Sequence, residues 1–422
     1  MKIAIISSSF FPVIDGVTVA IHYRLQRLSE LGHQVILFCP DYSVLKNIYP
    51  NWQEYTGTIL PGITVVNLPS TESIGLDFER DVTSKSYQIV EQKLNEFQPE
   101  IIHVDEAERL TTRFLHLPGV KFAKKSEIPC VAFYHTNYLD YFDDYFNLPF
   151  GFNILLKTIL GWVFSWIYNQ YDLTLVASRI TQANLRQLGI KNLYLADILG
   201  VDLTQYTAAF KNNNYLVERY DLPDLQSKIK LLFLGRLTPD KGWNFGLAAL
   251  SKLPTEIRQK IAIIIAGDGD MSDRIQQTLA KVTSHVYLLG RIPPEFVPAL
   301  LINGDILITN SQKETKGLTV MEAAAASLPA IAPRAGGVID TIQDGTTGFL
   351  YEPQNESDFL AKLNLLISNQ SLRESMGIQA QQAIQKYSWA QVVDNLVEIW
   401  TEQINQKKIS SPRINRIRLT SK

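Results

Sequence analysis

Short continuous apolar runs alternate with longer stretches of helical spacing from the start of the chain. Residues 3–6 form the first apolar run, residues 17–31 carry apolar side chains at helical spacing, and residues 34–38 form the next run. Short apolar runs predict buried strands, and a helix between two such runs supplies the crossover that parallel strands need. The beginning of the chain therefore predicts parallel βαβ units.

The same alternation continues through the first half of the chain and restarts in the second half. It predicts strands at 63–68, 101–104, 129–134 and 173–176, and then at 229–234, 261–266, 286–289, 305–309 and 328–332. The pattern is typical of an α/β protein with two Rossmann-like, doubly wound parallel-sheet domains that face each other across a cleft. Ligands of such sheets bind beyond the carboxyl ends of the strands.

The length of 422 residues also favours two domains over one. The segment between the two series of strands is polar and contains Pro223, which is typical of a linker. The predicted boundaries are an N-terminal domain at 1–203, a linker at 204–228, a C-terminal domain at 229–388, a helix at 389–406 that returns toward the N-terminal domain, and a basic disordered tail at 407–422.

Composition narrows the classes of partner. The 40 basic residues against 42 acidic ones give no chain-wide attraction to nucleic acid, so recognition of phosphate must be local. Cys39 and Cys130 are the only cysteines, and both lie in apolar runs that predict buried thiols. The first apolar run is shorter than the core of a secretion signal, which favours a cytoplasmic protein.

Two carboxylates bracket the turn between the predicted strand at 305–309 and the helix that follows. Glu314 precedes Gly317 and Glu322 follows it. A glycine there lets backbone amides at the helix N-terminus approach an anion. A carboxylate accepts hydrogen bonds from vicinal hydroxyls, so the stretch suits a ligand with a phosphate between two hydroxyl-bearing groups. A nucleotide sugar has this layout.

A second charged loop follows the predicted strand at 229–234. It places Arg236 and Lys241 five positions apart, where two cations can bind a diphosphate and stabilise it as it leaves. For any single such pair, an exposed loop with solvated charges is the better explanation. Because this loop and the loop at Glu314 follow strands of one predicted sheet, we expect them to share a site.

Two further polar motifs each have a functional and a structural interpretation. His135 comes directly after the apolar run that ends at Tyr134, and Thr136 and Asn137 follow it, which favours function over a structural histidine. Asp268-Gly269-Asp270 has the form of a metal motif, but it follows a strand and is typical of a glycine turn. We expect no metal and no cofactor. A GxGxxG fingerprint is absent, which argues against a dehydrogenase.

Residues 235–242 and 314–322 resemble the retaining glycosyltransferases of family 4, which have the GT-B fold. The resemblance extends over nearly the whole chain and includes Asp15-Gly16, His135, Ser178, Gly200-Val201-Asp202, Gly267-Asp268-Gly269 and Leu289-Gly290-Arg291. Residues 11–17, 134–137 and 335–337 look most like the subgroup of sulfoquinovosyl-diacylglycerol synthase and GDP-mannose-dependent α-mannosyltransferases.

The resemblance implies a role for each matching residue. Catalytic roles fall to His135, beside the anomeric centre as a hydrogen-bond donor, and to Arg236, Lys241 and Glu314. The donor would be a UDP- or GDP-sugar. Its sugar would be bound by Glu314, its ribose by Glu322 and its base by Arg291 and Ile292, and Gly16 would contact it from the first domain. Its diphosphate would be bound by Arg236, Lys241, Gly317, Leu318 and Thr319. Lys316 replaces a common aromatic, so we expect this protein's own specificity there.

The segment 151–168 is unusually apolar and is interrupted by Lys157. It is too short for a membrane span of ~20 residues, which leaves a helix lying on a membrane or a buried helix. Both alternatives stay open. The segment could form part of an acceptor side that takes a lipid, and the acceptor-side candidates are Asp15, Asn137, Tyr138, Trp162 and Trp166.

The sequence therefore predicts a metal-independent, retaining hexosyltransferase that acts on a lipid or glycan acceptor. Its location would be cytoplasmic, with peripheral contact to the cytoplasmic face of a membrane as one alternative. Other hypotheses are a nucleotide-sugar epimerase or hydrolase on the same fold, and a non-catalytic nucleotide-sugar-binding partner of another transferase.

Overall fold

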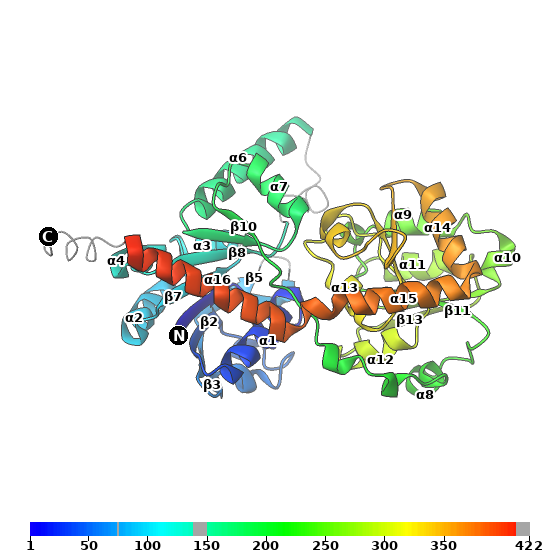
Figure 1. Ribbon diagram of the computed structural model, residues 1–422, viewed down its shortest axis with the longest axis horizontal. Helices are drawn as coiled ribbons and strands as arrows, with labels where there is room; N and C mark the ends of the chain where they lie inside the picture. Colours follow the sequence, from blue (N-terminus) through cyan, green and yellow to red (C-terminus); the bar gives the residue numbers. More distant parts are fainter. Residues whose placement is uncertain (74–75, 138–149, 411–422) are drawn as a thin grey trace, which may run out of the picture. The chain divides into compact units, whose positions relative to one another are not determined.

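The computed structural model describes residues 1–73, 76–137 and 150–410 (Figure 1). Within them the chain forms two compact units: residues 1–137, 150–199 and 389–410 make up the N-terminal unit, and residues 200–388 make up the C-terminal unit. The linker predicted at 204–228 belongs to the C-terminal unit, because Leu216 and Leu225 are buried in its core. The segment is polar on average, so its composition gave no sign that these two leucines are buried.

The N-terminal unit is built on an eight-stranded sheet that is parallel except for one edge strand, β3. Its order is β10 (Leu193–Leu195), β9 (Leu173–Val176), β8 (Cys130–Tyr134), β7 (Ile101–Asp105), β1 (Lys2–Ser7), β2 (Gln34–Pro40), β4 (Ile63–Leu68) and β3 (Gly57–Leu60). A separate antiparallel pair is formed by β5 (Ser70–Ser73) and β6 (Leu76–Val82). The helices are α1 (Gly16–Glu30), α2 (Tyr87–Phe97), α3 (Ala107–Phe114), α4 (Val120–Ser126), α6 (Phe150–Tyr168), α7 (Arg179–Gln187) and α16 (Trp389–Ser410).

The last helix, α16, completes the N-terminal unit (Figure 1). It packs beside α1, where Arg27 makes a bidentate hydrogen bond to the carboxylate of Asp394. The rings of Tyr23 and Trp389 also stack there, with their centroids 5.2 Å apart. The helix continues to Ser410, so residues 407–410 of the predicted disordered tail are helical. The rest of that tail lies outside the described residues.

The C-terminal unit contains a six-stranded, fully parallel sheet. Its order is β13 (Val286–Gly290), β12 (Ile261–Ala266), β11 (Ile229–Leu234), β14 (Ile306–Ile308), β15 (Ala330–Pro333) and β16 (Gly348–Tyr351). Successive residues of a strand enter cores on opposite faces, as Leu231 and Leu232 do on β11. The helices are α8 (Tyr215–Tyr220), α9 (Trp243–Leu250), α10 (Thr255–Arg258), α11 (Ser272–Leu279), α12 (Val297–Ile302), α13 (Leu318–Ala325), α14 (Glu356–Ser368) and α15 (Gln370–Ile384).

Two Rossmann-like parallel sheets are thus present, and that prediction is confirmed. The predicted cleft between the domains stays a prediction. Within the described part of the chain, every helix is too short or too polar to cross a bilayer.

Candidate active site

The two charged loops of the C-terminal unit meet because their strands, β11 and β14, are neighbours in the sheet. The first loop passes through the short helix η6 (Pro239–Lys241) and reaches Gly242, which has a φ of 74°. A Cβ atom on Gly242 would lie 2.2 Å from the carbonyl oxygen of Asn310, which follows β14. Only glycine allows this approach, and the approach brings Lys241 to Glu314.

Lys241 and Glu314 form an ion pair at this junction. The Lys241 ammonium donates to Oε1 of Glu314 at 2.6 Å, and both side chains are 22% exposed. Burial alone would raise the pKa of the Glu314 carboxyl, but the Lys241 ammonium outweighs it and holds this pKa below its usual value. Lys241, which is predicted to bind the diphosphate, and Glu314, which is predicted to bind the sugar, are therefore in direct contact.

Arg236 is the second cation of this loop. Its Nη2 donates to Oδ2 of Asp240 at 2.9 Å, and the Arg236 side chain is 55% exposed whereas that of Asp240 is 1% exposed. The buried carboxylate therefore anchors one edge of the guanidinium. A side chain that is more than half exposed is accessible to a phosphate.

The N-terminus of α13 places backbone amides at this site. Gly317 has a φ of 79° and precedes the helix, and the first bond within the helix runs from Val320 N to Gly317 O. The amides of Leu318 and Thr319 lie ahead of that bond, at the positive end of the helix dipole. Such an end binds an anion.

Glu322 lies one turn farther along α13 and is half-buried. Burial raises the pKa of its carboxyl to about 7. Arg291 and Ile292 follow β13, two strands away from β11. Arg291 Nε lies 3.5 Å from Oδ2 of Asp268, whose Oδ1 accepts from the amide of Gly269. One oxygen of this aspartate is thus bonded within the predicted glycine turn, and the other faces the guanidinium that follows β13.

Lys316 differs from the expectation of a ligand-facing residue. Its side chain is buried, and its ammonium lies 4.8 Å from the centroid of the Tyr387 ring. Its carbonyl accepts from the Thr341 hydroxyl. These contacts hold the loop that contains Glu314 against Thr341 and against Tyr387, near the end of the C-terminal unit.

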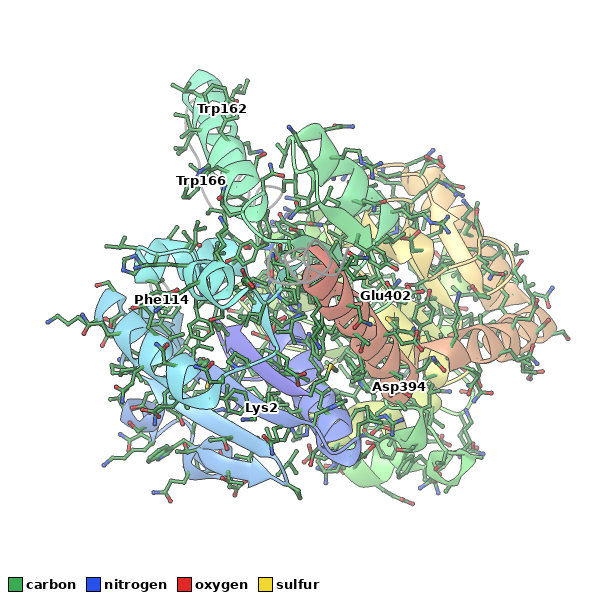
Figure 2. The ribbon with its side chains drawn as sticks, turned by 60° about the vertical axis from the view of Figure 1, so that its left-hand side comes forward. Lys2, Phe114, Trp162, Trp166, Asp394 and Glu402 are labelled. Atoms are coloured by element: carbon green, nitrogen blue, oxygen red, sulfur yellow. The ribbon has the colours of Figure 1, made fainter. Side chains whose placement is uncertain are left out.

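The N-terminal unit presents its candidates at the carboxyl ends of β1, β7 and β8. Asp15 caps α1 by accepting from the amides of Val17 and Thr18, both at 2.8 Å, and Gly16 is the exposed first residue of that helix. Asn137 is buried. Tyr138 lies outside the described residues. Trp162 and Trp166 are exposed on α6 (Figure 2).

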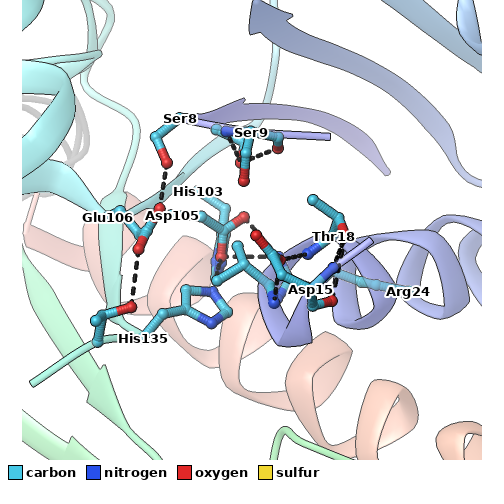
Figure 3. A network of polar contacts seen from close by, with 12 residues as sticks. Ser8, Ser9, Asp15, Thr18, Arg24, His103, Asp105, Glu106 and His135 are labelled. Carbon is cyan, nitrogen blue, oxygen red and sulfur yellow. Dashed lines mark hydrogen bonds and ion pairs between the residues drawn. The ribbon is translucent and has the colours of Figure 1, made fainter. Parts of the chain in front are cut away.

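His135 lies in a buried ionic cluster that the sequence analysis missed (Figure 3). Its Nε2 is 2.6 Å from Oδ1 of Asp105, whose carboxylate also pairs with Arg24 at 3.0 Å and contacts His103 Nε2 at 3.2 Å. Beside it, Glu106 accepts from the hydroxyls of Ser8 and Thr136. The one available signal was the position of Asp105, a polar residue directly after an apolar strand.

Comparison with known proteins identifies the family. Residues 14–195 match the family described as Glycosyltransferase Family 4, and residues 219–383 match Glycosyl transferases group 1. The chain belongs to the GT-B glycosyltransferases. The predicted resemblance to this family is thereby confirmed, and transfer from nucleotide sugars is its activity.

Curated relatives of this glycosyltransferase match along most of its length. Sulfoquinovosyl transferase SQD2 of Arabidopsis thaliana is 25% identical over 91% of this chain and 70% of its own length. A GDP-mannose-dependent alpha-mannosyltransferase of Corynebacterium glutamicum is 26% identical over 96% of this chain and 89% of its own. The alpha-monoglucosyldiacylglycerol synthase of Streptococcus pneumoniae is 25% identical over 84% and 76%.

The fold of this glycosyltransferase also matches solved structures. The crystal structure of Anabaena Alr3699/HepE in complex with UDP and glucose superposes with a TM-score of 0.70 at 17% identity, covering 95% of this chain and 100% of that chain. At that identity the likeness establishes the GT-B fold alone.

Proposed function

We propose that this glycosyltransferase moves a hexosyl group from a UDP- or GDP-sugar to a lipid hydroxyl at a membrane surface, with retention of anomeric configuration. The donor part of the proposal is supported by one observation: Lys241, Glu314 and Arg236 lie on the two loops beside the N-terminus of α13. Cations and helix amides are the groups that a diphosphate needs, and a carboxylate beside them is suited to the hydroxyls of a sugar.

In this reaction the bond between the sugar's anomeric carbon and the diphosphate breaks as the acceptor oxygen bonds to the same carbon. The acceptor attacks from the face that the leaving group vacates, and its proton passes to the leaving phosphate. Arg236 and Lys241 stabilise the charge that develops on the nucleoside diphosphate.

We propose that these cations replace a divalent metal ion at the diphosphate. Asp268, the first carboxylate of the Asp-x-Asp motif, supports this because its oxygens contact Arg291 and the Gly269 amide. We expect turnover to be unchanged after dialysis against EDTA, measured as release of nucleoside diphosphate. A loss of turnover that magnesium or manganese restores would contradict this part of the proposal.

Donor affinity should depend on the ionisation of Glu322. A carboxylate accepts from both ribose hydroxyls, whereas the protonated acid, favoured below about pH 7 by burial, does so less well. If only the carboxylate binds, affinity for UDP or GDP rises by about tenfold from pH 6 to pH 8. Calorimetric titration at several pH values measures this.

The control for the pH dependence is Glu322→Gln. Titration of the ligand's own phosphate affects both proteins equally, so the difference between them isolates Glu322. A wild-type profile that parallels the Glu322→Gln profile would contradict ribose binding by this carboxylate.

The acceptor side of the proposal is supported by an exposed apolar face on α6. Trp162 is 72% and Trp166 56% exposed, and the same face includes the exposed residues Ile154, Leu155, Ile159 and Val163. The opposite side of the helix carries Phe164, Ile167 and Tyr168 into the core of the N-terminal unit. A helix with one packed and one open apolar side suits the interface of a bilayer, where tryptophan is favoured.

We expect Trp162→Gln with Trp166→Gln to weaken binding to phosphatidylglycerol vesicles by roughly tenfold or more, because each indole loses about 1 kcal/mol or more of burial. Co-sedimentation measures the change. Ile378→Gln, which alters an exposed apolar side chain on α15, should bind as the wild type does. Equal sedimentation of the double variant and the wild type would contradict membrane contact by α6.

Substrate tests separate the proposal from its alternatives. The protein is incubated with UDP-glucose or GDP-mannose, with and without vesicles that contain diacylglycerol. We expect nucleoside diphosphate release that requires the vesicles and a glycosylated lipid with the donor's anomeric configuration. Free or epimerised sugar without acceptor would indicate a hydrolase or epimerase, and donor binding without turnover would indicate a binding partner.

A further inference from the structure

Asp105 is the centre of the buried cluster around His135 (Figure 3). Its side chain is fully buried at the end of β7 and contacts Arg24 from α1, His103 from its own strand and His135 from beyond β8. Burial alone would raise the pKa of the Asp105 carboxyl, but Arg24 and the two histidines hold it well below its usual value. The group is therefore a carboxylate, which accepts hydrogen bonds and donates none.

A carboxylate at this position determines the hydrogen-bond direction of His135. Because Asp105 only accepts, the His135 Nε2 at 2.6 Å must carry the proton of that bond. In the neutral ring the other nitrogen, Nδ1, is then unprotonated and is a hydrogen-bond acceptor. This direction is the reverse of the donor role predicted for His135 at the sugar.

His103 shows the same arrangement with an independent determinant. The indole N–H of Trp400 on α16 donates to His103 Nδ1 at 3.3 Å, so His103 carries its proton on Nε2, toward Asp105. Burial lowers the pKa of His103 to about 4, which keeps the ring neutral. One carboxylate thus balances one guanidinium and accepts from the Nε2 of both imidazoles.

We infer that Asp105, held by Arg24, is a positioning residue that fixes His135 as its Nε2–H tautomer, so that His135 Nδ1 accepts a hydrogen bond from a hydroxyl of the transferred sugar. The inference rests on the proposed function for the identity of the hydroxyl. The tautomer itself depends on the cluster alone and is testable without substrate.

The first test measures the tautomer in the full-length protein. Histidine is labelled with ¹⁵N, and long-range ¹H–¹⁵N spectra are recorded at pH 8; the chain has 6 histidines, and His135→Asn identifies the signals of His135. We expect His135 to be an Nε2–H tautomer in the wild type and a tautomeric mixture in Arg24→Met/Asp105→Asn. An Nδ1–H tautomer in the wild type, or an unchanged ring in the variant, would overturn the inference.

The second test asks whether Asp105 acts through His135. Arg24→Met accompanies Asp105→Asn so that no buried charge is left unpaired, and circular dichroism checks the fold. We expect kcat to fall by about 10²-fold with a smaller change in the donor KM, as for a misplaced catalytic group. In a His135→Ala background the same pair of substitutions should cost less than threefold, because the group they position is gone.

Additive losses in the two backgrounds would overturn the positioning role. Asp394→Asn is the matched control, since it removes an aspartate that pairs with Arg27 one turn along α1 from Arg24, and its kcat should equal that of the wild type. A wild type that transfers no sugar would refute the proposed function, while the tautomer measurement would still decide the role of Asp105.

Discussion

Arg236→Ala is expected to lower turnover by about 10²–10³-fold, the loss typical of removing one electrostatic partner of a transition state. Arg236 is more than half exposed beside the ion pair of Lys241 and Glu314, and Asp240 anchors one edge of its guanidinium. Charge on the leaving diphosphate grows as the glycosidic bond breaks, so the interaction strengthens toward the transition state. We therefore expect kcat to fall more than donor affinity.

The design must account for Asp240, whose carboxylate is buried. Arg236→Ala/Asp240→Asn also removes the negative charge that Arg236 neutralises, and thermal unfolding compares both variants with the wild type. Arg274→Ala, an exposed arginine on α11 of the same unit, is the matched control and should keep full turnover. Near-normal turnover in a well-folded double variant would refute the role of Arg236.

Lys241→Ala should cost at least as much turnover, about 10²-fold or more, for two reasons. The diphosphate loses a cation, and Glu314 loses the partner that holds its pKa below the usual value. Without Lys241, burial dominates and the carboxyl takes up a proton more readily. A protonated Glu314 has fewer acceptor sites for the sugar hydroxyls.

A double-mutant cycle separates these two effects. Glu314→Gln alone should lower turnover and leave Lys241 able to bind the diphosphate, so the affinity for free UDP or GDP should be nearly unchanged. Lys241→Ala should weaken that affinity in both the wild-type and Glu314→Gln backgrounds. If Lys241→Ala leaves nucleoside diphosphate affinity intact in calorimetric titration, Lys241 is a structural partner of Glu314 and not a phosphate ligand.

The sequence was sufficient to place most of the central strands along the chain and the two loops that meet near Glu314, because runs such as 231–234 and 261–266 are apolar on both faces. Short edge strands such as β10 (Leu193–Leu195) were missed, because three residues carry too little pattern. The prediction that the two loops share a site followed from one inference, that their strands belong to one sheet, whereas the ion pair of Lys241 with Glu314 was found only in the structure.

The cluster around Asp105 was beyond sequence analysis for a physical reason. Arg24 and Asp105 are 81 positions apart, and Trp400 is 297 positions from the His103 nitrogen to which it donates. The direction of the hydrogen bond at His135 depends on these distant partners, since a lone histidine adopts either tautomer. The sequence singled out His135, but the donor role assigned to it at the sugar is the opposite of the one that we infer from these partners.

The position of α16 has a consequence for biosynthesis. Domains of a growing chain usually fold in the order in which they emerge from the ribosome. Here the N-terminal unit lacks Trp400 and Asp394, the partners of His103 and of Arg27 on α1, until α16 has been made. Among the described residues the C-terminal unit is contiguous, from residue 200 to 388, so it can complete its core before α16 emerges. The contact that orients His103 beside the ionic cluster of His135 therefore forms only after the whole C-terminal unit has been synthesised.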